Sequence, residues 1–240
     1  MQEQAAAIKE IAKRGQDPLT GPLRLSIVHT IGPYFLPERV KHVIELVPQM
    51  PLALQENFTV KLLEMLRTGE LDCVIMAEPF PDAGLAVALL YEELFLAAVP
   101  SAHPLAARES INLKELKRET LLLLGTGHCF RDHVLEVCPE FVRFASDAEG
   151  IRKRLEGSSL ETSRYRVASG MGITGVPQLS VRASERSSGS DPVRYILFAA
   201  PVPSRRVVLV WRRSFTRHEA TAALRNAVYA GLLSGVLRLS

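Results

Sequence analysis

The chain has 240 residues, 47% of them hydrophobic and 23% charged, which is enough to fold and bury a substantial core. Its net charge of +3 comes from basic and acidic residues spread along the chain, so composition does not support nucleic-acid binding by this segment itself. Apolar runs all fall short of the ~18 residues of a membrane span, and the first residues lack the pattern of a secretory signal. We therefore expect a cytoplasmic protein with no membrane contact.

The first residues have the pattern of a helix end. Ala5, Ile8 and Ile11 are apolar with charged residues between them, and Gly15 follows. A chain that begins within a helix suggests a segment cut from a longer protein. We interpret residues 1–17 as the remnant of a linker helix.

Strands and helices alternate from residue 23 onward. In the first half we expect strands at 23–29, 52–56 and 71–77, a helix over 38–47 opened by Pro37, and a helix over 59–68 capped by Thr59 and stopped by Gly69. This β-α-β-α-β order predicts a parallel sheet with right-handed crossovers.

The second half repeats the theme. We expect strands at 94–99, 120–124 and 206–212. One helix would start at about residue 129, a second would follow a capping box at 158–161, and a third would span 216–233. Loops are expected at 176–177 and 184–191. Two similar α/β halves, joined near residues 90–97 and separated by a cleft, account best for this pattern.

The three cysteines contain one informative pair, Cys129 and Cys138, which are nine residues apart. On one regular helix that spacing gives a rise of roughly 13 Å and an offset of about half a turn. A disulfide needs Cα atoms ~4.4–6.8 Å apart, so the bond requires the segment to unwind. Pro139 disfavours helix at Cys138 and eases that change. Oxidation would therefore be a conformational event, as a switch requires.

The neighbours of Cys129 favour a low thiol pKa. The residue lies at a predicted helix N-terminus, and His128 and Arg131 are close in sequence. A thiolate near water reacts with peroxide to a sulfenic acid, which a second thiol converts to a disulfide. Two other interpretations stay open: unreactive core cysteines, and a metal site built from Cys129, Cys138, His128 and His133. The third cysteine, Cys73, lies in an apolar strand and is expected in the core.

The segment from Gly127 to Asp132, followed by Cys138, resembles the redox motif of the OxyR group of LysR-type transcription regulators, which respond to peroxide. Segments at 29–37, 71–75, 159–177 and 203–206 resemble the same family in the same order. The likeness spans roughly residue 20 to the end. It departs at Ser163 and Arg166, where the family pattern is more apolar.

The resemblance implies a periplasmic-binding-protein-like fold of two Rossmann-like α/β subdomains. Subdomain I would hold residues 20–92 and 198–240, and subdomain II residues 93–197. It implies Cys129 as the peroxide-reactive thiol and Cys138 as the resolving thiol. It further implies that the peroxide-binding residues are Thr30, Thr59, His128 and Arg206. Arg131 and Asp132 would be supporting residues.

The family also implies partners. A winged helix-turn-helix ahead of residue 1 would bind DNA, and the full-length protein would form homodimers and homotetramers. RNA polymerase is a possible contact, glutaredoxin or thioredoxin would be the reductant, and no cofactor or metal is expected. Thiol oxidation would be stoichiometric rather than enzymatic.

Four alternatives stay open at this stage. Thr59 could be only a helix cap and Arg206 only an exposed charge at a strand edge. The cleft could bind a small organic co-inducer, with unreactive cysteines. The chain could also be a thiol peroxidase, which repeated turnover with thioredoxin would reveal.

Overall fold

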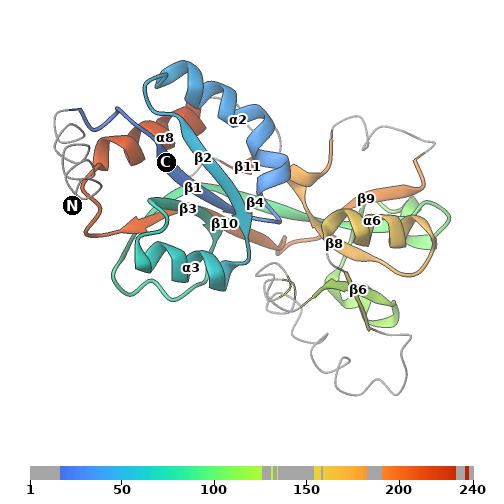
Figure 1. Cartoon of the computed structure of the whole chain (residues 1–240). Helices are drawn as coiled ribbons and strands as arrows, with labels where there is room; N and C mark the ends of the chain where they lie inside the picture. Colours follow the sequence, from blue (N-terminus) through green and yellow to red (C-terminus); the bar gives the residue numbers. More distant parts are fainter. Residues whose placement is uncertain are drawn as a thin grey trace. The chain divides into compact units, whose positions relative to one another are not determined.

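The computed structural model describes residues 17–125, 131, 134, 154–157, 159–182, 191–230 and 236–237. Contacts divide the chain into two compact units, which we describe separately (Figure 1). The first unit holds residues 1–28, 32–90 and 208–232, and the second holds residues 29–31, 91–207 and 233–240. Relative to the expected subdomains, residues 29–31, 91–92, 198–207 and 233–240 fall in the second unit.

The first unit is built on a parallel sheet. Its first three strands are β1 (Leu23–Val28), β2 (Leu52–Asn57) and β3 (Cys73–Ala77). β1 lies between the other two, pairing in parallel with Leu23 opposite Leu52 and Leu25 opposite Cys73. The sheet continues beyond β3 with the parts of β10 (Ser204–Arg212) and β4 (Leu85–Pro100) that belong to this unit. The predicted parallel arrangement is confirmed.

Three helices cover this sheet: α2 (Gly32–Leu46), α3 (Thr59–Thr68) and α8 (His218–Ala230). Figure 1 shows α2 and α8 on one face and α3 on the other, and α2 packs against α8. α3 ends where predicted, since Gly69 takes the left-handed conformation at φ 86° and closes the helix with a hydrogen bond to Leu66.

The predicted start of α2 was wrong. The helix begins at Gly32, and Pro37 lies inside it rather than before it. A proline in a helix removes one hydrogen bond, which disfavours this arrangement locally. Burial outweighs that cost, because Phe35, Arg39 and Val43 follow one another at helical spacing and are each 2% exposed.

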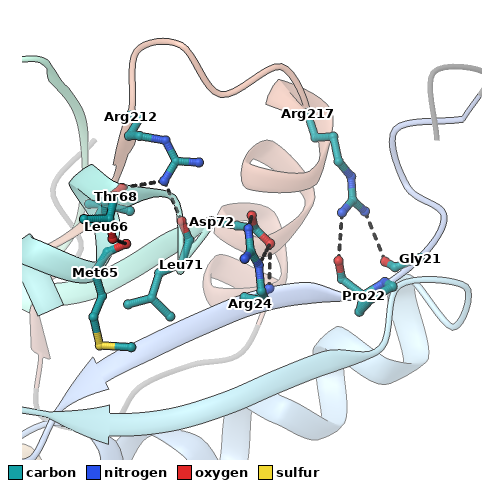
Figure 2. A network of polar contacts seen from close by, with 10 residues as sticks. All are labelled: Gly21, Pro22, Arg24, Met65, Leu66, Thr68, Leu71, Asp72, Arg212 and Arg217. Atoms are coloured by element: carbon teal, nitrogen blue, oxygen red, sulfur yellow. Dashed lines mark hydrogen bonds and ion pairs between the residues drawn. The ribbon is translucent and has the colours of Figure 1, made fainter. Parts of the chain in front are cut away.

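Three arginine side chains of the first unit form hydrogen bonds between segments that are far apart in the sequence (Figure 2). Arg24 pairs with Asp72 at 2.7 Å, and this hydrogen bond raises the pKa of the Arg24 guanidinium. Arg212 donates to the carbonyls of Leu66 and Leu71. Arg217, 9% exposed, donates to a row of carbonyls at the entry to β1: Pro18, Thr20, Gly21 and Pro22.

The second unit is organised around β4, which is antiparallel to its neighbours β8 (Thr174–Pro177), β9 (Val193–Phe198) and β11 (Val236–Leu237). β5 (Ser110–Ile111) pairs in parallel with β9, and β6 (Leu121–Leu124) with β7 (Arg154–Gly157). Among the described residues, the helices of this unit with defined bounds are α6 (Leu160–Ala168) and the short η1 (Pro104–Ala107), η2 (Leu113–Arg118) and η3 (Gln178–Ser180). An apolar cluster including Leu96, Leu122 and Val176 forms its core.

Three local predictions in this unit were wrong. β4 has 16 residues rather than the six expected, and residues 176–177 form a strand rather than a loop because Val176 pairs with Leu96 of β4. The N-cap of α6 is Ser159, whose hydroxyl accepts a hydrogen bond from the backbone N–H of Thr162. The predicted capping box between Ser158 and Glu161 therefore does not define the start of this helix. In the described part of the chain, no helix is long and apolar enough to cross a membrane.

Candidate functional site

Thr30 lies just after β1, in the short segment 29–31 that belongs to the second unit. The residue is 3% exposed, and two of its oxygens accept hydrogen bonds from one arginine. Arg205 donates from Nη1 to the Thr30 hydroxyl at 3.0 Å and from Nη2 to the Thr30 carbonyl at 3.1 Å. The hydroxyl that the sequence singled out is therefore part of a buried polar network.

Arg205 is itself held by a buried carboxylate. Glu93 on β4 is 0% exposed and Arg205 on β10 is 3% exposed. Glu93 Oε2 accepts from Arg205 Nε at 2.8 Å and lies 2.7 Å from Nη2, while Oε1 accepts from the backbone N–H of Leu179 at 2.8 Å. Both charges are paired and hydrogen-bonded, which is the condition for burying them.

The alternation of a β-strand decides which arginine reaches Thr30. Along β10, Arg205 is buried and Arg206 is exposed, because successive side chains point to opposite faces. The sequence led us to place Arg206 near the site, whereas the structure places Arg205 against Thr30. From the sequence we identified neither Glu93 nor Arg205 as a site residue. A usable signal was the acidic Glu93 inside a strongly apolar run, since a buried carboxylate requires a cationic partner.

Thr59 belongs to the first unit and is the first residue of α3. The N-cap position is Phe58, and no side chain caps this helix start, so the interpretation of Thr59 as a cap is wrong. Its hydroxyl oxygen is buried and has no hydrogen-bond partner within the described ranges. A buried hydroxyl without a partner is costly, and it can donate to or accept from a bound molecule.

Most of the predicted redox segment lies outside the described residues. This applies to His128, Cys129, Asp132 and Cys138, and to His133 of the metal alternative. Two residues between the cysteines are described, and both are helical: Arg131, which is half-buried, and Val134, which is 8% exposed. A Cβ built on Gly175 of β8 would lie 3.7 Å from Cγ2 of Val134, so Val134 packs against that strand.

Cys73 is fully buried in β3, which confirms its predicted place in the core. Burial raises the pKa of its thiol far above the ordinary value, and the negative charge of Asp72 raises it further. Since the thiolate is the reactive form, Cys73 is not suited to react with peroxide. Within the described residues, no cluster of His, Cys, Asp and Glu side chains could hold a metal ion.

Comparison with known proteins relates the chain to one family. Residues 16–232 match the model of the LysR substrate binding domain. A protein of Streptomyces viridosporus named "probable hydrogen peroxide-inducible genes activator" is 35% identical over 231 residues, which covers 94% of this chain and 71% of that protein.

Solved structures agree with this relationship. The reduced OxyR regulatory domain of Pseudomonas aeruginosa is 39% identical, with a TM-score of 0.77, covering 89% of this chain and all of that one. An OxyR structure in the oxidised form is 32% identical, with a TM-score of 0.75, covering 89% of this chain and 97% of that one. The two-subdomain α/β fold is therefore shown by relatives of both redox states.

Proposed function

The chain belongs to the family of LysR substrate-binding domains, and on this premise we propose that it is the hydrogen-peroxide-sensing regulatory domain of a transcription activator. The switch would be a reversible disulfide between Cys129 and Cys138. The Streptomyces relative is named for induction by hydrogen peroxide, which favours this function over a small organic co-inducer. The two units would be the regulatory subdomains.

The observation that carries the proposal is the anchored helical residue between the two cysteines. Val134 is helical, buried and packed against β8. A helix that continued to both cysteines would hold their Cα atoms roughly 13 Å apart, well beyond the ~4.4–6.8 Å of a disulfide. Forming the bond would then require part of the segment between the cysteines to unwind against the packing of Val134, which would convert a chemical event into a change of structure.

The chemistry uses two thiols and one peroxide. The Cys129 thiolate attacks one peroxide oxygen, so an S–O bond forms and the O–O bond breaks. The sulfur is oxidised to a sulfenic acid, and the departing hydroxide takes up the proton released by the thiol and becomes water. The Cys138 thiol then displaces a second water from the sulfenic acid and forms the disulfide.

We assign the surrounding residues roles in this reaction. His128 and the hydroxyls of Thr30 and Thr59 would bind and polarise the peroxide, with Arg131 and Asp132 as supporting residues, and the resemblance to the family first assigned the arginine of the site to Arg206. Contact between Arg205 and Thr30 favours Arg205 for the position first given to Arg206.

The output would require a larger protein. A DNA-binding winged helix-turn-helix ahead of this segment, homodimers and homotetramers, and a possible contact with RNA polymerase complete the proposed activator. Glutaredoxin or thioredoxin would reset the disulfide in the cytoplasm. Its relatives are transcription regulators rather than enzymes, one being named a DNA-binding transcriptional dual regulator, and we propose stoichiometric oxidation here.

Mass spectrometry after one equivalent of hydrogen peroxide tests the proposal. The unmodified chain should form the Cys129–Cys138 disulfide, and Cys138→Ser should accumulate the Cys129 sulfenic acid. Cys73→Ser is the matched control and should leave the disulfide yield unchanged. A chain that forms no such bond, or that turns over many equivalents of peroxide with thioredoxin, contradicts the proposed sensor.

A further inference from the structure

We infer that Glu93 is a positioning residue for the peroxide reaction: through Arg205, it makes the Thr30 hydroxyl a hydrogen-bond donor to the oxygen that leaves. The inference rests on the proposed function and adds to it a chemical reason for peroxide selectivity. It uses only contacts within the second unit.

The first step concerns the direction of the Thr30 hydroxyl. A hydroxyl can donate and accept, whereas a guanidinium can only donate. At 3.0 Å from Arg205 Nη1, the Thr30 oxygen must therefore accept, and its own proton has to point to another acceptor. The positive charge of Arg205 also withdraws electron density from that oxygen, which makes the remaining O–H a stronger donor.

The second step concerns what keeps Arg205 in place. One oxygen of Glu93 binds Nε and Nη2 of Arg205, and the other is held by the Leu179 N–H on η3. With Glu93 at 0% and Arg205 at 3% exposure, both partners are shielded from bulk water. Leu179 and Arg205 bind different oxygens of Glu93, so an amide at position 93 can present its one oxygen to Leu179 or to Arg205 but not to both.

The third step is the chemistry of the leaving group. When the thiolate attacks peroxide, the O–O bond breaks and negative charge develops on the departing oxygen before it takes a proton and becomes water. A fixed, polarised O–H donor stabilises that charge and costs no reorganisation. Alkylation of the same thiolate by iodoacetamide releases iodide and gains nothing from an O–H donor. The network should thus favour a hydroperoxide over other thiol reagents.

The test compares both reactions of Cys129 in purified variants of the whole chain. Glu93→Gln should lower the rate constant with hydrogen peroxide by about tenfold or more, and Thr30→Val by about 10–100-fold, with the iodoacetamide rate within about twofold of the unmodified chain. Glu92→Gln is the matched control, since Glu92 binds the Ser204 hydroxyl instead of Arg205, and both rates should stay unchanged.

Two outcomes overturn the inference. Glu93→Gln could keep the peroxide rate, or it could lose both rates equally, which would mean a purely structural role. If that variant does not fold, the double variant Glu93→Leu with Arg205→Met removes both charges together and is expected to fold. It should react slowly with peroxide and normally with iodoacetamide, and a normal peroxide rate would refute the role of Glu93. Failure of the unmodified chain to oxidise at Cys129 would instead refute the proposed function.

Discussion

We expect the packing of Val134 to oppose formation of the Cys129–Cys138 disulfide. It lies between the two redox cysteines, is 8% exposed and packs against β8 near Gly175. If oxidation pulls Val134 out of this place, weakening its packing destabilises the reduced form alone. We therefore expect Val134→Ala to make the disulfide easier to form and harder to reduce.

The magnitude follows from the buried surface. Replacing valine by alanine removes two methyl groups, each worth about 0.8 kcal/mol of burial, or about 1.6 kcal/mol together. For a two-electron couple this corresponds to a shift of about 35 mV toward a more negative reduction potential. A cavity left behind in the reduced form would enlarge the shift.

Equilibration with glutathione buffers, read out by mass spectrometry of the Cys129–Cys138 bond, measures this potential. Val167→Ala is the matched control, because Val167 is equally apolar and 0% exposed but lies on α6, outside the redox segment. Both variants should lose stability, and only Val134→Ala should shift the potential. Equal shifts in both, or no shift in Val134→Ala, would show that Val134 keeps its packing when the disulfide forms.

Three further results are expected from other parts of the molecule. Burial raises the pKa of Cys73 above its ordinary 9.0, so above about pH 9 the thiol ionises only in the unfolded chain. The free energy of unfolding should therefore fall with rising pH by about 1.4 kcal/mol per pH unit more in the unmodified chain than in Cys73→Ala. Urea denaturation at a series of pH values measures this difference. Thr59→Val should change stability by less than about 1 kcal/mol, since its hydroxyl has no partner in the described part of the chain, yet slow Cys129 oxidation; an unchanged peroxide rate would argue against a peroxide contact. Arg217→Ala should cost about 3 kcal/mol, because several carbonyls lose a charged donor, and calorimetry should show a melting temperature lower by roughly 6–12 °C.

Local patterns in the sequence were sufficient for much of the fold. The alternation of strands and helices predicted the parallel pairing of β1, β2 and β3, and an apolar run placed Cys73 in the core. The end of α3 at Gly69 followed from the conformational freedom of glycine. The helix end depends on backbone conformation within one turn, and the strand pairing follows from the order of strands and helices along the chain, so the order of residue types encodes both.

Other features were decided only by tertiary contacts. The helix α2 runs through Pro37, and β8 forms where a loop was expected, because burial against distant elements outweighs local preference. Whether Arg205 or Arg206 is buried depends on strand register, because a shift of one residue would exchange the buried and exposed faces of the strand. Thr30 and Arg205 are 175 residues apart, and no local pattern specifies which of two neighbouring arginines will meet a hydroxyl at that distance along the chain.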